Sequence, residues 1–271
     1  MSGTNPGAAA IERAIRAANA AGRPALSAFL TAGFPDRSSF ASLLRDVAAE
    51  ADLVELGVPF SDPMADGVTI QRSSRVALEA GVTLSWILDT VEPLPVSAPL
   101  VLMGYLNPFL AYGLERLAER AVGVGISGLI VPDLPYEECR PLRDAADAAG
   151  LALIQLVTPV TPDDRLGILC EASRGFVYAV TMTGTTGSTN SPVRADAALD
   201  EYLQRVRDAS PLPVLAGFGI RSAEQLARVG ARADGAIVGS ALIETLERNE
   251  DPIGFLRSLR GGEVKGKGAS S

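Results

Sequence analysis

Short apolar runs alternate with amphipathic stretches eight times along this chain of 271 residues. The apolar runs are nearly continuous, which is typical of parallel strands that are covered on both faces. They are Ala25–Thr31, Asp52–Gly57, Pro99–Met103, Ser127–Pro132, Leu151–Val157, Gly175–Val180, Leu212–Gly217 and Gly235–Gly239. The clearest helical stretches between them are Ser38–Glu50, Gly113–Val122, Glu137–Ala149 and Asp196–Ala209. This repeating pattern predicts a parallel α/β architecture.

Eight strand–helix units without a dividing linker favour a (β/α)8 TIM barrel of the α/β class, a fold that commonly needs ~250 residues. An open sheet with a second lobe is the structural alternative. We expect one catalytic barrel domain over residues 1–260 and a disordered tail over residues 261–271, which are rich in Gly, Ser and Lys. The additional segment Ala8–Ala20 precedes the first strand and predicts an extra N-terminal helix at the bottom of the barrel.

Several residues indicate where individual helices begin and end. Gly150 and Gly230 follow helical stretches and are interpreted as C-terminal stops. Asp163 and Ser222 stand before helical stretches and are interpreted as N-caps. The Pro-rich residues 92–99 are expected to connect a helix to the third strand.

The chain contains no histidine, and its only lysines are Lys265 and Lys267 in the predicted tail. Without histidine, the Ser-His-Asp and Cys-His nucleophile systems, histidine proton shuttles and the commonest metal ligand are excluded. A buried Schiff-base lysine or a phosphate-binding lysine inside the fold is not expected either. Any acid–base groups should therefore be carboxylates or tyrosines, and we expect no metal site.

The formal net charge of −8 and the pI of about 4.8 argue against a nucleic acid or an anionic membrane as partner. Cys139 and Cys170 are the only cysteines, too few for a disulfide framework or a zinc site. No apolar run reaches the roughly 20 residues of a membrane span, and the first 25 residues lack a signal-peptide core. These observations predict a cytoplasmic location.

The exit of the second strand carries a cluster of acidic residues. Glu55 falls inside the apolar strand, where burial should raise its pKa and suit it to carry a proton at neutral pH. The alternative is a structural carboxylate satisfied by arginine or by backbone amides. Asp62 and Asp66 follow in a loop that contains two prolines, and aspartates in loops often only form turns. Asp66 can nevertheless fold back over the barrel mouth and face Glu55.

The exits of the last three strands are expected to bind an anion. Residues 181–187 form a loop of small residues after the sixth strand, residues 217–220 follow the seventh, and residues 239–241 follow the eighth. Loops seven and eight commonly hold phosphate in barrel enzymes, because amides at helix N-termini supply positive charge without a cation. The pattern predicts a site for a small phosphorylated substrate.

These strand exits resemble the tryptophan synthase alpha chain family. The acidic segment Glu55-Leu-Gly-Val-Pro-Phe-Ser-Asp-Pro-Met-Ala-Asp-Gly-Val-Thr-Ile-Gln71 is highly specific to that family. Further matches are Phe29–Pro35, Met103–Pro108, Val131–Pro135, Gly217–Ile220 and Gly239–Ser240. They run from the first strand to the eighth in the order of the family and cover almost the whole barrel.

The resemblance implies a lyase of tryptophan biosynthesis that splits indole-3-glycerol phosphate into indole and glyceraldehyde 3-phosphate, without a metal or an organic cofactor. Glu55 then matches the catalytic acid and base of this retro-aldol reaction, and Asp66 matches the aspartate that stabilises positive charge at the indole N–H. The resemblance also implies substrate-binding roles for Phe29, Tyr105, Ile130, Tyr178, Thr186, Gly187, Phe218, Gly219, Gly239 and Ser240. Among these, Thr186 and Gly187 match a closing loop, and the last four match the phosphate site.

The family's alpha chain normally works with a pyridoxal-phosphate-dependent beta chain, so the resemblance implies an alpha2-beta2 assembly in which only the beta chain carries that cofactor. Two departures concern this partnership. Val68 stands where the family commonly has proline, and Ser188-Thr189 stand where it often has Ala-Arg. Three alternatives remain: a free-standing indole-3-glycerol phosphate lyase, a phosphosugar isomerase or prenyl transferase on the same barrel, and a non-enzymatic phosphate-binding module.

Overall fold

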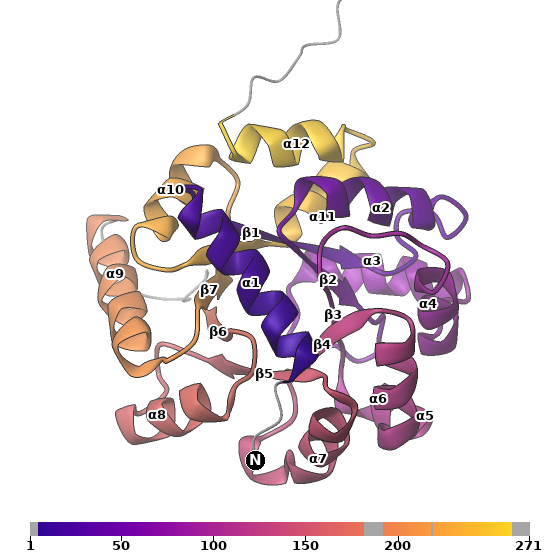
Figure 1. Cartoon of the computed structure of the whole chain (residues 1–271). Coiled ribbons are helices and arrows are strands. Elements are labelled where there is room, and N and C mark those ends of the chain that lie inside the picture. The colour runs from indigo at the N-terminus through magenta and orange to yellow at the C-terminus, as the bar shows by residue number, and fades with distance from the viewer. Residues whose placement is uncertain (1–4, 182–191, 218, 262–271) are drawn as a thin grey trace, which may run out of the picture.

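The computed structural model describes residues 5–181, 192–217 and 219–261. In this part of the chain, parallel strands β1 to β8 pair in sequence order and close into a barrel (Figure 1), which confirms the predicted (β/α)8 fold. The strands are β1 (Ala25–Thr31), β2 (Leu53–Gly57), β3 (Leu100–Met103), β4 (Ile126–Ile130), β5 (Ala152–Val157), β6 (Val177–Val180), β7 (Val214–Gly217) and β8 (Gly235–Val238).

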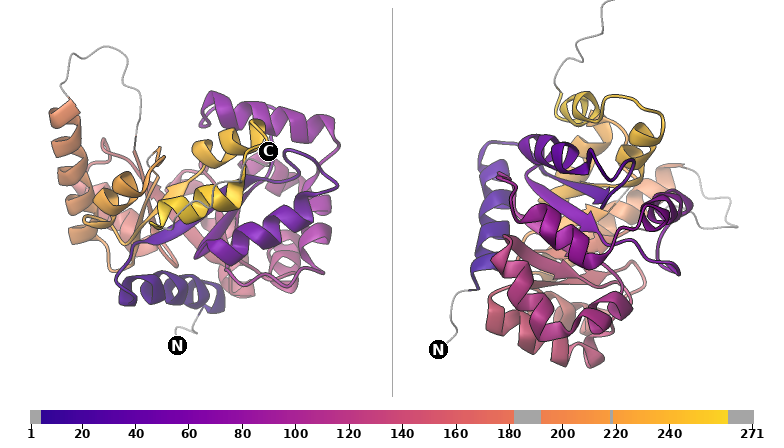
Figure 2. Two further views of the ribbon diagram at one scale, coloured as in Figure 1. Left: turned by 90° about the horizontal axis from the view of Figure 1, so that it is seen from above. Right: turned by 90° about the vertical axis from the view of Figure 1, so that its right-hand side faces the viewer.

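Helices surround the barrel, and several strand connections contain two of them (Figure 2). The helices are α1 (Pro6–Ala20), α2 (Phe40–Glu50), α3 (Val68–Glu79), α4 (Leu84–Val91), α5 (Leu106–Tyr112), α6 (Leu114–Gly123), η1 (Tyr136–Glu138), α7 (Arg140–Ala149), α8 (Asp163–Ala172), α9 (Pro192–Ala209), α10 (Ala223–Gly230), α11 (Ser240–Glu247) and α12 (Pro252–Leu259). The Pro-rich residues 92–99 connect α4 to β3, as predicted.

Helix α1 closes the end of the barrel opposite the strand exits. It crosses the barrel diagonally in Figure 1, and its residues Ile11 and Ile15 are fully buried. They form one apolar cluster with barrel-interior residues such as Leu53, Phe176 and Leu215. The predicted extra N-terminal helix is therefore confirmed, and it leaves only the other end of the barrel open to a substrate.

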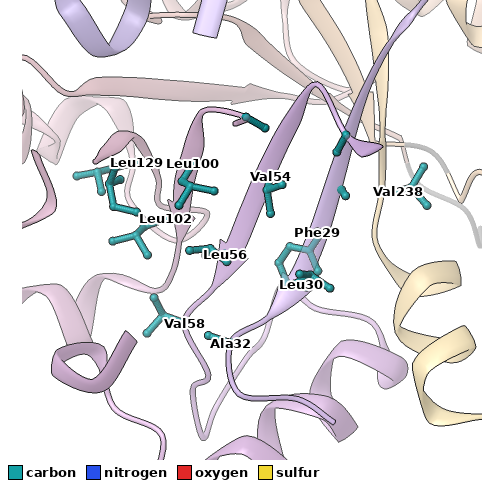
Figure 3. Packing of buried hydrophobic residues seen from close by; sticks show 14 of the residues in the cluster. Phe29, Leu30, Ala32, Val54, Leu56, Val58, Leu100, Leu102, Leu129 and Val238 are labelled. Carbon is teal, nitrogen blue, oxygen red and sulfur yellow. The ribbon is translucent and has the colours of Figure 1, made fainter. Parts of the chain in front are cut away.

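A second apolar cluster fills the layer between the strands and the outer helices. Figure 3 shows part of it, with Leu30, Val54 and Leu102 among the labelled side chains. Every residue of β1 and β2 is buried, which explains why their sequences are almost continuously apolar instead of alternating. A polar side chain inside such a strand must therefore have a specific environment.

The pairing of β1 with β2 places two polar residues inside the barrel. Ser27 pairs with Leu53, and two residues further along Phe29 pairs with Glu55. Because side chains alternate along a strand, Ser27 and Phe29 point to the same face of β1. Glu55 lies in the same interior, two residues beyond Leu53, which belongs to the apolar cluster formed with α1.

Two helix-boundary predictions are wrong by one residue, and two are confirmed. Pro162, in extended backbone, is the N-cap of α8, so that Asp163 is its first helical residue. Gly230 is the last helical residue of α10, and the right-handed Ala231 caps that helix. Gly150 caps α7 in a left-handed conformation, and the Ser222 side chain caps α10.

Candidate active site

Glu55 is a fully buried carboxyl group in the barrel interior. Its Oε1 accepts a hydrogen bond of 2.8 Å from the Ser27 hydroxyl on β1, and its Oε2 has no hydrogen-bond partner among the described residues. Burial disfavours the charged form and raises the pKa of Glu55 to about 7, an effect that the hydrogen bond from Ser27 partly offsets. Glu55 can therefore carry or release a proton near neutral pH.

Asp66 lies on the loop between β2 and α3 and folds back over the strand ends. Its side chain hydrogen-bonds Tyr105, which follows β3. The Tyr105 hydroxyl also accepts a hydrogen bond of 2.9 Å from the backbone N–H of Ala65. Burial raises the pKa of Asp66 to about 6, and the hydrogen bond with Tyr105 opposes that shift. Asp66 is therefore mostly ionised at neutral pH, unlike Glu55.

Two further contacts hold the Asp66 loop in place. The ring of Phe60 stacks on the ring of Tyr105 with a centroid distance of 5.0 Å. The Gln71 side chain donates a hydrogen bond of 2.9 Å to the backbone oxygen of Asp66. Tyr105 and Gln71 thus tie the conformation of the Asp66 loop to the end of β3 and to the first turn of α3.

Tyr178 on β6 lies within electrostatic reach of both carboxyl groups. Burial raises its pKa well above the usual value, and the nearby charges of Glu55 and Asp66 raise it further. Its ring occupies the space beside β7, because a Cβ on Gly217 would stand 2.8 Å from the Tyr178 hydroxyl oxygen. Glycine at this position leaves room for the tyrosine in the barrel mouth.

A narrow cavity of about 20 Å³ lies beside Asp66 and Tyr105, with room for about one water molecule. Its lining is mostly apolar with a single carboxylate, Asp66. The lining residues are Phe29, Gly57, Val58, Asp66, Ile70, Ser74, Met103, Gly104, Tyr105 and Pro132. The Phe29 ring lies across the end of β2, because a Cβ on Gly57 would stand 2.4 Å from the tip of that ring. This lining suits contact with an apolar, aromatic ligand group, which needs a wider opening than these 20 Å³.

The N-terminus of α11 lies next to this cavity. Gly239, its N-cap, is close to Phe29, since a Cβ there would lie 3.5 Å from the Phe29 Cβ. Gly239 has no side chain to cap the helix, whereas Ser222 caps α10 by accepting from the Gln225 N–H at 3.3 Å. Because Gly239 supplies no side-chain cap, the first amides of α11 can bind an anion.

The structure brings most of the predicted site residues to one end of the barrel. Glu55, Asp66, Tyr105 and Tyr178 are linked by hydrogen bonds or electrostatic interactions, and Phe29 joins them to Gly239. Ile130 is fully buried in the interior cluster with Met103 and Tyr178. Ser240 begins α11, and Gly219 is exposed in the loop after β7. Thr186, Gly187, Phe218 and the departing Ser188-Thr189 lie outside the described residues.

Sequence reasoning missed Ser27, the hydrogen-bond partner of Glu55, and Met103, which lines the cavity. A signal for Ser27 was present, because it is a polar residue in an apolar strand and stands two positions before Phe29. Met103 carried no signal, since methionine at a strand end usually only fills the core.

The described ranges contain no group of three or more Cys, Asp or Glu residues that could hold a metal ion. None of the described helices is long and apolar enough to cross a membrane. The site combines a carboxyl group that can carry a proton (Glu55), an ionised carboxylate (Asp66), the mostly apolar cavity and the N-terminus of α11, which can bind an anion. This set can protonate an aromatic group, stabilise the resulting cation and hold a phosphate at the same time.

Comparison with known proteins identifies the family of this chain. Residues 15–257 match the family model described as the tryptophan synthase alpha chain. The tryptophan synthase alpha chain of Desulfovibrio desulfuricans is 47% identical over 253 residues, covering 91% of this chain and 97% of the relative. That of Chloroflexus aggregans is 48% identical over 231 residues, covering 84% of this chain and 85% of the relative.

Solved structures agree with these matches. The tryptophan synthase subunit alpha of Legionella pneumophila superposes with a TM-score of 0.83 at 33% identity, covering 93% of this chain and 97% of that one. A chain from the aminoacrylate- and BRD0059-bound tryptophan synthase of M. tuberculosis superposes with a TM-score of 0.80 at 35% identity, covering 93% and 94%. The likeness thus extends over nearly the full length of each chain.

Proposed function

The chain belongs to the tryptophan synthase alpha chain family, and from this premise we propose that Glu55 and Asp66 are its two catalytic carboxyl groups. The protein is a lyase that cleaves indole-3-glycerol phosphate to indole and glyceraldehyde 3-phosphate. Membership in the family disfavours the phosphosugar isomerase, the prenyl transferase and the non-enzymatic module. The active site is proposed to lie in a single catalytic domain over residues 1–260.

The observation that carries the proposal is the buried Glu55, whose pKa lies near 7 and whose Oε2 has no partner in the described part of the chain. Indole leaves only after its C3 is protonated, because the protonated ring can accept the electrons of the breaking carbon–carbon bond. Protonated Glu55 gives its proton to C3. The resulting carboxylate then takes the proton of the side-chain hydroxyl as the bond breaks, which restores the acid.

Asp66 supports the same step as an anion. Protonation of C3 turns the indole ring into an indoleninium cation, whose charge is shared by the ring nitrogen. A carboxylate that accepts a hydrogen bond from that N–H stabilises the cation. The pKa of about 6 keeps Asp66 mostly ionised at neutral pH, and Tyr105 holds its side chain over the mouth. The two carboxyl groups therefore take different roles because their pKa values differ.

The remaining site residues are proposed to bind the substrate. Phe29 and Ile130 form the indole pocket, with Tyr105 and Tyr178 at its polar side, and the family resemblance assigns Thr186 and Gly187 to a closing loop. Phe218, Gly219, Gly239 and Ser240 bind the phosphate, a proposal supported by the uncapped first turn of α11. Gly239→Val should crowd these amides and weaken inhibition by glycerol phosphate, and unchanged inhibition would contradict this placement.

We propose that this chain itself uses no cofactor and that pyridoxal phosphate belongs to a beta-chain partner in an alpha2-beta2 assembly. Two exposed apolar side chains near the active-site loop support a partner surface there: Met64 is 92% exposed and Val68 is 67% exposed. Cys139 and Cys170 are buried free thiols, which supports the proposed cytoplasmic location.

The test is whether the purified chain releases indole from indole-3-glycerol phosphate, and whether added beta chain increases the rate. Indole release that requires Glu55 supports the proposed site. Cleavage without any binding or activation by the beta chain would favour the free-standing lyase over the subunit. Release that persists fully in Glu55→Gln would contradict the role proposed for Glu55.

A further inference from the structure

The two oxygens of the Glu55 carboxyl group have different surroundings. Oε1 accepts the Ser27 hydroxyl at 2.8 Å, and both residues are fully buried. Oε2 is also buried and has no hydrogen-bond partner in the described ranges. An unpartnered buried carboxyl oxygen is costly, so the asymmetry requires an explanation.

We infer that Ser27 is a positioning residue that holds Oε1 of Glu55 and thereby presents Oε2 as the oxygen that exchanges the proton with the substrate. This inference rests on the proposed catalytic role of Glu55. The hydroxyl group of Ser27 does not meet the reacting atoms, and it acts only through the carboxyl group of Glu55. Any non-polar residue at this position would leave both carboxyl oxygens without a partner among the described residues.

The position of Ser27 on β1 determines the side from which it contacts the Glu55 carboxyl group. Ser27 lies two residues before Phe29 on β1, and Phe29 is directly paired with Glu55 on β2. The short serine side chain therefore meets the Glu55 carboxyl group from below, on the side away from the barrel mouth. A hydrogen bond from below leaves the upper oxygen free for a ligand at the mouth.

The neighbouring titratable groups are few. Tyr178 on β6 interacts electrostatically with Glu55, and Asp66 interacts with the same tyrosine from the loop after β2. The adjacent strands β1 and β3 contain no titratable residue. Asp52 precedes β2 at the opposite end and is paired with Arg23. Within the described ranges, Ser27 is thus the one residue that donates a hydrogen bond to Glu55.

Ser27→Val and Ser27→Thr form a matched pair, because the two side chains have nearly the same shape and only threonine keeps the hydroxyl. In Ser27→Val, kcat should fall about ten-fold, the size expected for losing one hydrogen bond to a charged group, and KM should stay unchanged. Cleavage requires protonated Glu55, so activity falls as the pH rises through its pKa. The alkaline limb of the pH–activity profile should move up by about one pH unit in Ser27→Val, because the hydrogen bond from Ser27, which favours the carboxylate, is lost. Ser27→Thr should keep both values.

Thr31→Val provides the control. Thr31 lies on the same strand, and its hydroxyl contacts that of Ser73 at 2.6 Å, away from Glu55. Ser73 keeps a second partner, the backbone oxygen of Ile70 at 2.9 Å. This variant loses one buried hydroxyl from β1, and its pH profile should match that of the unmodified chain.

The outcomes separate this inference from the proposed function. An unchanged pH profile and kcat in Ser27→Val would overturn the positioning role, while inactive Glu55→Gln would still support the catalytic role of Glu55. Equal losses in Ser27→Val and Ser27→Thr would also overturn it, since packing alone would then explain them. If Ser27→Val does not fold, Ser27→Ala replaces it with the same expectations.

Discussion

Strand β2 and the residue that precedes it carry two carboxyl groups with opposite environments. Asp52 accepts hydrogen bonds from Arg23 at 2.6 and 2.7 Å, from Arg260 at 2.9 Å and from the Leu26 N–H at 2.9 Å. Glu55, three positions further, has only the Ser27 hydroxyl among the described residues. The pKa of Asp52 is lowered despite partial burial, and that of Glu55 is raised to about 7 by burial.

The pKa values of Asp52 and Glu55 differ because the two carboxyl groups have different partners at the two ends of the barrel. At the bottom, the ion pairs of Asp52 join the start of β2 to Arg23, two residues before β1, and to Arg260, the residue after α12. At the mouth, a charged partner for Glu55 would keep it ionised and remove the proton that the reaction requires. Asp52, which meets arginine, is thus placed to stabilise the fold, whereas Glu55, which meets none among the described residues, is the carboxyl group proposed for the chemistry.

The largest expected effect comes from Glu55→Gln, which keeps the size of the side chain but removes its acid. Cleavage should slow by about 10²–10⁴-fold, the usual contribution of a general acid and base. Steady-state indole release measures this change, and circular dichroism checks that the fold is intact. Full residual activity would place the proton donor elsewhere.

Asp66→Asn should have the next largest effect. The amide cannot stabilise the indoleninium cation as an anion does, so kcat should fall about 10²–10³-fold. The measurement is kcat and KM for indole-3-glycerol phosphate. A rise in KM with unchanged kcat would show that Asp66 only binds the substrate.

The pH dependence of stability should separate the mouth from the bottom. Below about pH 4.5, the usual pKa of glutamate, Glu55 is protonated in the folded and the unfolded state, and its burial costs no unfolding free energy. Because burial raises the folded-state pKa, the cost grows as the pH rises to about 7. Relative to Glu55→Gln, the unmodified chain should lose about 3 kcal/mol of unfolding free energy across this window. Urea unfolding at both pH values measures it, and parallel profiles would contradict the raised pKa.

Asp52→Asn should lower stability and spare the chemistry. Losing the charged hydrogen bonds should cost about 2 kcal/mol of unfolding free energy at neutral pH. Because the pKa of Asp52 is lowered, this contribution is present above about 3.8 and disappears as the pH falls through the lower folded-state value. Glu79→Gln, at an exposed pair with Arg75 at 3.9 Å, is the control and should change stability by less than about 0.5 kcal/mol. A large loss of kcat in Asp52→Asn would break the division between the two ends.

Much of the fold could be predicted from the sequence, because strands covered on both faces are almost continuously apolar. The start and end of β1 were predicted to the residue, and the N-terminal helix was predicted to within two residues of its start. Helix ends were less predictable. At α8, Pro162 takes the N-cap position that a capping side chain on Asp163 suggested, because proline already holds the extended conformation that an N-cap needs.

The position of the candidate site could be predicted from an acidic residue that interrupts an apolar strand, as Glu55 does. Its environment was not, because the sequence could not show whether an arginine or a serine would meet it. The same limit applies to Tyr105, whose contacts with Phe60 and Asp66 depend on how a loop folds back over the barrel. Such contacts join residues that are far apart in the chain, and no local pattern indicates them.

The most direct test is a pH titration of the side-chain carboxyl carbons by ¹³C NMR, with Glu55→Gln and Asp52→Asn used to assign the two signals. We expect Glu55 to titrate near pH 7 and Asp52 to titrate below its usual value of 3.8. If the Glu55 signal titrates near 4.5, its usual value, burial does not prepare this group to carry the proton at neutral pH.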